Sequence, residues 1–228
     1  RLQGDWSSDV CSSDLLALMT VYAAKLWQTF STLHHDEASR RFAVSVALAF
    51  FPAVIVGVLA HDFIKTVLFE TPALIALMLI LGGVVLLFID RLAPPPKDFD
   101  ASALPFRKAL LIGVAQCLAM VPGVSRSGAT IVGALMLRVE KRAAAEFSFF
   151  LSLPTMAAAV GYDLFKSRDL LDFSAYTQIA VGFLLAFVTG VIVVKGVLGY
   201  ISRYGYALFG WWRIIVGSTA LLALWWVG

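Results

Sequence analysis

A polar stretch with one arginine separates two apolar runs in the middle of this chain, and it constrains the fold more than any other feature. Ala109–Val121 precedes the stretch and Ile131–Leu137 follows it. It reads Pro122-Gly123-Val124-Ser125-Arg126-Ser127-Gly128-Ala129-Thr130. A proline and two glycines break a helix, and irregular backbone inside a bilayer is tolerated only where protein buries it or it lines a wet cavity. We therefore expect the tip of a broken or re-entrant helix.

The composition places the surroundings of this stretch in a membrane. Hydrophobic residues make up 60% of the chain and charged residues only 14%, which is too apolar for a soluble domain. The apolar runs approach the roughly 20 residues that a helix needs to cross a bilayer. The net charge of +3 comes from basic residues in short loops, where they set orientation. We expect no nucleic-acid partner, and the two cysteines have no disulfide or metal spacing.

The apolar segments predict an all-α, polytopic membrane protein with about six spans and a re-entrant helical hairpin. The expected segments are Leu15–Phe30, Phe42–Ala60, Ala73–Ile89, the interrupted pair Ala109–Leu137, Ala143–Tyr162, Ile179–Tyr200 and Ala207–Val227. If the interrupted pair is re-entrant, most basic loops fall on one side of the membrane. The positive-inside rule then assigns that side to the cytoplasm and favours re-entry over a full crossing.

Residues 1–14 differ from the rest of the chain. They are rich in Ser and Asp and contain the near-repeat Ser7-Ser8-Asp9-Val10 and Ser12-Ser13-Asp14-Leu15. This leader resembles translated sequencing-adapter sequence, and the alternative is a disordered polar tail. In both cases we expect residues 15–228 to form a single transmembrane domain.

The residue types in the polar stretch suit a phosphate ligand. The planar guanidinium of Arg126 matches phosphate oxygens and stays charged. Hydroxyl donors are expected from Ser125, Ser127 and Thr130. A helix that opens near Ser127–Gly128 would add free backbone N–H groups and a favourable dipole. Ser127 and Thr130 are three residues apart and share a helix face, although Ser127 could instead cap the helix.

A purely structural reading of the same residues is a helix kink. Arg126 would then pair with a carboxylate such as Glu146, and the serines would bond within their own or a neighbouring helix. We favour a ligand site because an arginine flanked by hydroxyls and glycines exceeds what a kink requires. The other acidic side chains, Asp62 and Asp163 among them, are expected to be solvated or to cap helices.

The central motif resembles the second signature of the bacterial undecaprenyl-diphosphate phosphatase family, the bacitracin-resistance phosphatases. It is the stretch Gln116-Cys117-Leu118-Ala119-Met120-Val121-Pro122-Gly123-Val124-Ser125-Arg126-Ser127-Gly128-Ala129-Thr130-Ile131. Other stretches are similar to the same family. They are Phe51-Pro52-Ala53-Val54, His61-Asp62, Ile64-Lys65, Glu146-Phe147-Ser148-Phe149, Pro154, Asp163-Leu164 and Lys166-Ser167.

The resemblance implies a multi-pass enzyme of the bacterial inner membrane that hydrolyses undecaprenyl diphosphate to undecaprenyl phosphate. This reaction recycles the lipid carrier of peptidoglycan synthesis and confers bacitracin resistance. The resemblance also implies inverted repeats with two re-entrant hairpins, an isoprenoid lipid diphosphate substrate among membrane lipids, and a divalent cation, Mg²⁺ or Ca²⁺, whose ligands stay unassigned. A homodimer is a candidate assembly.

Carried onto this chain, the family's functional residues fall on the polar stretch. Arg126 would clamp the diphosphate as a catalytic and binding residue. Ser125, Ser127 and Thr130 would form hydrogen bonds with it, and Gly123 and Gly128 would let the backbone approach it.

The family's first signature, which is rich in Glu and contains a Pro-Ser-Ser-Thr-Gly-His stretch, has no counterpart here. No Glu precedes Glu37, and His34, His35 and His61 lie in another context. We therefore expect a chain that is truncated at its N-terminus, lacks the first hairpin and is impaired in turnover. Two other readings stay open. One is a transporter or flippase for a phosphorylated lipid or anion, and the other is non-functional sequence from an incomplete assembly.

Overall fold

The computed structural model describes Thr20, Tyr22, Trp27, Thr29 and residues 31–60, 71–167 and 176–227. In these ranges the elements are helices, as expected for an all-α protein, and the one β-type pairing is an isolated bridge between Asp98 and Val139. The helices are α3 Glu37–Leu59, α5 Pro72–Leu92, α6 Phe106–Gln116, α7 Arg126–Met136, α8 Lys141–Ser167, α9 Tyr176–Tyr204 and α10 Ala207–Val227, with short 3₁₀ turns η2 Ala101–Ala103 and η3 Cys117–Met120.

Four of the described helices are long and apolar enough to cross a membrane. They are α3, α5, the part of α9 from Val181 to Ile201, and α10. The prediction of a polytopic membrane protein is therefore confirmed, whereas the number of about six spans stays a prediction. The leader, most of Leu15–Phe30, and His61, Asp62 and Lys65 lie outside the described residues, as does the side chain of Asp163.

Local sequence explains where the first helices begin. Asp36 caps α3 by accepting hydrogen bonds from the backbone N–H groups of Ala38 at 3.3 Å and Ser39 at 3.0 Å. A hydrogen bond from the Ser39 hydroxyl, together with these backbone bonds, holds the pKa of Asp36 below its usual value. Pro72 opens α5, where its missing N–H costs nothing.

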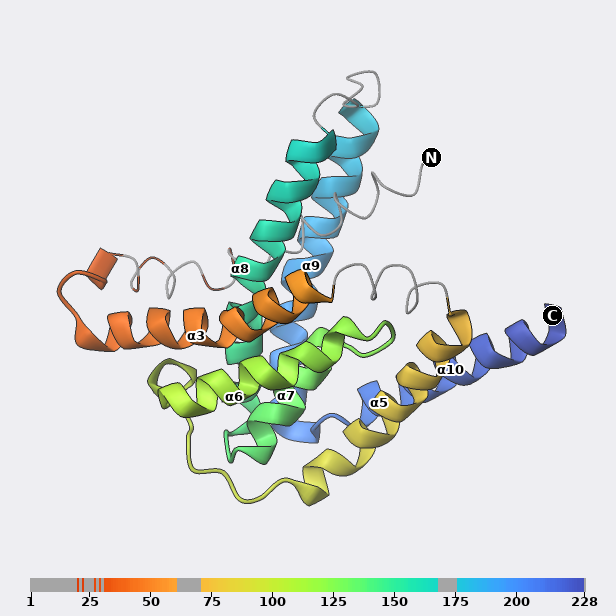
Figure 1. Cartoon of the computed structure of the whole chain (residues 1–228), viewed down its shortest axis with the longest axis horizontal. Coiled ribbons are helices and arrows are strands. Elements are labelled where there is room, and N and C mark those ends of the chain that lie inside the picture. The colour runs from red at the N-terminus through yellow and green to blue at the C-terminus, as the bar shows by residue number, and fades with distance from the viewer. Residues whose placement is uncertain are drawn as a thin grey trace.

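Helices α6 and α7 form a hairpin whose residues belong to the core, with α6 packed against α3 and α7 packed against α8 (Figure 1). Each contains 11 residues, which is about 16 Å at 1.5 Å per residue and well short of the roughly 30 Å of a bilayer core. The two outer ends meet, because Lys108 Nζ at the start of α6 donates to the carbonyl of Leu137 at the end of α7, at 2.7 Å. The chain thus returns to the side where it entered, as the re-entrant interpretation of Ala109–Leu137 requires.

Helices α5 and α10 pack as an antiparallel pair with their backbones in contact, and they lie side by side in Figure 1. A Cβ atom added to Gly83 would lie 2.7 Å from the carbonyl oxygen of Gly210. Small residues allow such close approach of membrane helices. The pair also contacts the hairpin, since α5 packs against α7, and it forms one wall of the candidate site.

Candidate functional site

The tip of the α6–α7 hairpin is a turn that only glycine fits. Gly123 has a φ of +89°, and a Cβ added there would lie 2.3 Å from the carbonyl oxygen of Ile75 in α5. Both facts exclude a side chain at this position, because φ in this range is strained for other residues. The turn therefore docks on α5 and brings the start of α7 to a fixed place.

Ser125 caps α7. Its backbone is extended, and its Oγ accepts a hydrogen bond from the N–H of Gly128 at 3.2 Å. The first intrahelical bond runs from Ala129 N to the carbonyl of Ser125 at 2.9 Å. The expected opening of the helix near Ser127–Gly128 agrees within one residue with its start at Arg126, whereas the alternative of Ser127 as the cap was wrong, because the Ser125 hydroxyl accepts from the N–H three residues ahead. Ser127 is exposed, with Oγ 3.1 Å from that of Ser125.

Two cavities open on this first turn of α7, and they share Leu86, Ser125, Gly128 and Arg213. We call the smaller one, of about 250 Å³, the hydroxyl-lined cavity after Ser125 and Ser127, although most of its other lining side chains are apolar, namely Leu86, Ile131, Phe149, Val197, Ile201, Phe209 and Trp212. We call the larger one, of about 370 Å³, the apolar cavity. Apart from Ser125 and Arg213, it is lined only by glycine and apolar side chains, namely Met78, Leu81, Gly82, Val85, Leu86, Ala115, Leu118, Val121, Val124, Gly128, Ala129, Val132 and Gly133.

Arg213 of α10 is a site residue that the sequence reasoning missed. It lines both cavities, and its NH2 group donates a hydrogen bond to the carbonyl of Gly123 at 2.6 Å. The signal that could have found it is the one that singled out Arg126, a cation inside an apolar span. Hydropathy by itself identifies Ala207–Val227 only as the last span.

Two other predicted site residues, Arg126 and Thr130, do not line the two cavities. Arg126 is the first residue of α7, is partly exposed, and is not among the described residues that line the two cavities. Thr130 is only 1% exposed, and its hydroxyl bonds the Ser127 carbonyl at 3.0 Å and the Ser148 hydroxyl of α8 at 2.6 Å. This position lets Thr130 hold α7 against α8. Glu146 Oε1 accepts a hydrogen bond from Arg142 Nε at 3.1 Å, and the pairing of Glu146 with Arg126 in the kink reading stays an open alternative.

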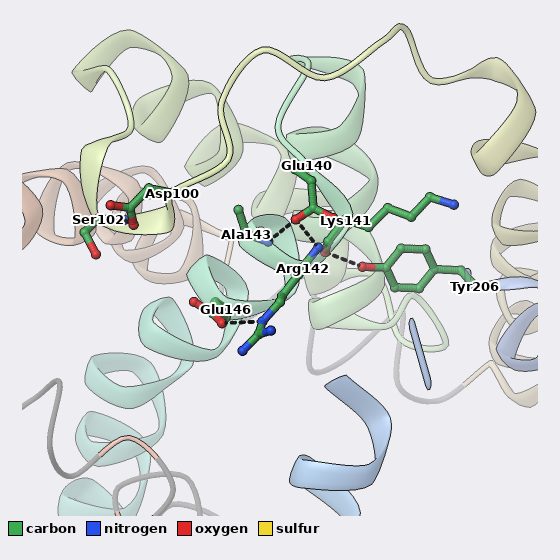
Figure 2. A network of polar contacts seen from close by, with 8 residues as sticks. All are labelled: Asp100, Ser102, Glu140, Lys141, Arg142, Ala143, Glu146 and Tyr206. Atoms are coloured by element: carbon green, nitrogen blue, oxygen red, sulfur yellow. Dashed lines mark hydrogen bonds and ion pairs between the residues drawn. The ribbon is translucent and has the colours of Figure 1, made fainter. Parts of the chain in front are cut away.

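Charged groups gather at the opposite end of the hairpin, where they join α5, α8 and α10. Lys141 Nζ pairs with Asp90 Oδ1 at 2.7 Å. Glu140 caps α8, and the Tyr206 hydroxyl donates to the carbonyl of Lys141 at 3.0 Å (Figure 2). Burial raises the pKa of Tyr206 above its ordinary value, and the charges of Asp90 and Glu140 raise it further, so the phenol stays a donor. This end of the hairpin is a structural clasp.

The acidic side chains do not form a metal site in the part of the chain that the structure describes. Among the side chains that the structure describes, no group of three or more His, Cys, Asp or Glu could hold a metal ion. Because Mg²⁺ is often held by one or two carboxylates together with substrate phosphates, the expected cation stays a prediction without assigned protein ligands.

Comparison with known proteins agrees with the resemblance seen in the central motif. The family described as bacitracin resistance protein BacA matches residues 11–219. An undecaprenyl-diphosphatase of Cereibacter sphaeroides is 67% identical over 92% of this chain and 78% of its own length. An undecaprenyl-diphosphatase of Paracoccus denitrificans is 60% identical over 92% of this chain and 79% of its own length. The chain thus belongs to the bacitracin resistance protein BacA family.

Proposed function

We propose that this chain is an undecaprenyl-diphosphatase, which hydrolyses undecaprenyl diphosphate to undecaprenyl phosphate and inorganic phosphate. Family membership and the names of the relatives support this activity. Those names describe a hydrolase and lend no support to the transporter alternative. The 67% sequence identity to a relative over 92% of the chain does not support the expectation of impaired turnover either.

One observation in the structure carries the proposal. The first turn of α7, with two hydroxyls and its helix N-terminus, lies at the junction of a hydroxyl-lined and an apolar cavity. Backbone N–H groups and the dipole at a helix N-terminus favour an anion. An isoprenoid diphosphate has both parts that such a junction accommodates, a charged head for the donors and an apolar tail for the larger cavity.

The chemistry follows from the donors at this turn. Water attacks the terminal phosphorus, the bond to the bridging oxygen breaks, and undecaprenyl phosphate leaves with the charge that develops on that oxygen. Ser125, Ser127 and the amides of the first turn bind the diphosphate oxygens. Preorganised donors of this kind act most strongly where charge develops in the transition state. Arg126, at the start of the same turn, supplies the fixed positive charge that phosphoryl transfer requires.

The setting of this reaction is the bacterial inner membrane, and the partners are the isoprenoid substrate and surrounding lipids. Divalent-cation dependence is part of the proposal because a diphosphate carries charge that a cation neutralises. The protein groups named above bind and orient the substrate in every step, and no ligand for the cation is assigned. A homodimer is proposed as the assembly to be checked by mass measurement in detergent.

The proposal is tested by phosphate release. The purified chain, reconstituted in lipid nanodiscs with Mg²⁺ or Ca²⁺, is expected to release phosphate from undecaprenyl diphosphate. Arg126→Ala is expected to lower kcat at least about 100-fold because it removes a preorganised positive charge. The matched control is Arg107→Ala, an exposed arginine of α6, which should retain normal turnover. A wild-type chain that releases no phosphate, or a fully active Arg126→Ala variant, would overturn the assignment.

A further inference from the structure

We propose that Arg213 is a positioning residue, which holds the tip of the hairpin through the carbonyl of Gly123 and so places Ser125 and the first turn of α7 against the substrate. The catalytic consequence rests on the proposed function, whereas the tether itself is a property of the fold and is tested separately.

The location of Arg213 within its helix is the first argument. It is the seventh residue of α10, which begins at Ala207, so it lies about 9 Å along an apolar helix. A cation at such a depth is costly and is retained mainly where it serves a function. Its NH2 group donates to Gly123 O at 2.6 Å, and its buried Nε has no hydrogen-bond partner in the described part of the chain. The unpaired Nε adds a desolvation cost to that of the buried charge.

The second argument is the space made for the guanidinium by α5. A Cβ added to Gly82 would lie 2.7 Å from Arg213 NH2 and 3.2 Å from its Cζ. The adjacent glycine has another role, since a Cβ on Gly83 would meet the backbone of Gly210. Gly83 thus permits the helix contact, and Gly82 lets the arginine cross α5 to reach the hairpin.

The third argument is what the tether controls. Gly123 lies between the Ile75 carbonyl and the Arg213 guanidinium. Only Val124 separates Gly123 from Ser125, the cap of α7, and Arg213 lines both cavities together with Ser125. A displaced guanidinium therefore releases the tip at the point where the donors of α7 are aligned. Misplacement of donors by about 1 Å is enough to cost much of their effect on the rate.

Hydrogen–deuterium exchange tests the tether without reference to activity. Gly82→Ala displaces only the flexible end of Arg213, and Arg213→Met removes the donor while keeping a long side chain. Both are expected to speed exchange of the amides in residues 121–128 about tenfold, as for the loss of one net hydrogen bond. The matched control is Gly196→Ala in α9, where an added Cβ meets nothing within 4 Å. Unchanged exchange at the tip in both variants would overturn the proposal.

Kinetics on the same variants separate positioning from simple stabilisation. Gly82→Ala is expected to lower kcat about tenfold, with KM changed less than about threefold, because an aligned donor acts in the transition state. Arg213→Lys keeps a positive charge and an N–H donor. It should therefore recover part of the kcat, and part of the protection of residues 121–128 from exchange, that Arg213→Met loses. Loss of melting temperature with kcat unchanged would contradict a positioning role. A wild-type chain without phosphatase activity but with the expected exchange pattern would reject the function and retain the tether.

Discussion

The two ends of the α6–α7 hairpin differ in the kind of polar group that they contain. At the outer end, cations and carboxylates are paired, as in Lys108 with Asp98 and Lys141 with Asp90. At the tip, donors predominate, and Arg126 is the single charged residue of the whole stretch from residue 109 to 137. Arg213 adds a second guanidinium from α10.

This difference assigns a structural role to the outer end of the hairpin and a ligand-binding role to its tip. Paired charges at the outer end satisfy one another, so they fix where the hairpin starts and ends. A tip with hydroxyls and guanidinium groups, and with no carboxylate in the sequence between residues 109 and 137, has a donor-rich composition that suits a ligand with acceptor atoms. An anion with several oxygens meets that requirement, in agreement with a diphosphate head group.

The largest effect on turnover is expected from a substitution that distorts only the tip of the hairpin. Gly123→Ala places a Cβ 2.3 Å from the carbonyl of Ile75 at a φ of +89°, so the turn must move. We expect a loss of at least about 100-fold in kcat, equivalent to about 2.7 kcal/mol in the activation free energy, measured as phosphate release. Gly182→Ala, where nothing lies within 4 Å of an added Cβ, serves as the control. Near-normal turnover in Gly123→Ala would show that tip geometry does not matter.

A change at the outer end should affect stability and spare turnover. Asp90 pairs with Lys141 at 2.7 Å and accepts a hydrogen bond from the N–H of Tyr206 at 2.9 Å. Asp90→Ala is expected to lower the free energy of unfolding by about 1–2 kcal/mol, a moderate value because both partners are partly exposed. Asp90→Asn removes the charge and keeps an acceptor, so it should lose less. Thermal unfolding in detergent measures both, and a kcat that falls with stability intact would contradict the division of roles.

The smallest effect is expected at the cap of α8. Glu140 Oε2 accepts hydrogen bonds from the N–H groups of Arg142 at 2.8 Å and Ala143 at 3.0 Å. Glu140→Ala should lower the free energy of unfolding by about 0.5–1 kcal/mol, as for other lost caps. Glu140→Gln, which retains an acceptor, provides the comparison in the same unfolding assay. Equal stability of the wild type and both variants would remove Glu140 from the clasp.

The fold could be predicted from the sequence to the extent that hydropathy and helix breakers determine it. The last span, Ala207–Val227, has the predicted bounds, and Ala73–Ile89 lies within the observed Pro72–Leu92. Both spans are strongly apolar, and the proline-rich loop that contains Pro94, Pro95 and Pro96 follows the earlier one. The return of the hairpin was also predicted, because Pro122 and Gly123 allow no continuous crossing helix.

The candidate site was predicted only in part. Ser125, Ser127 and Gly128 meet at the cavities because they are neighbours in one motif, which a sequence reveals. Arg213 is 90 residues from Gly123, and only the packing of α5 on α10 brings it there. The burial of Thr130 against Ser148 also depends on tertiary packing, since helical spacing alone does not say which face meets another helix.

The junction of the two cavities at Ser125, Gly128 and Arg213 gives the site two independent measures of its substrate. A methylene that enters the apolar side leaves lipid and not water, so the fit of the chain to the cavity decides the affinity there more than hydrophobic transfer does, while the donors sense only the phosphates. Selection for prenyl chain length is therefore expected in KM, and selection between one phosphate and two in kcat, so that either preference can evolve without the other.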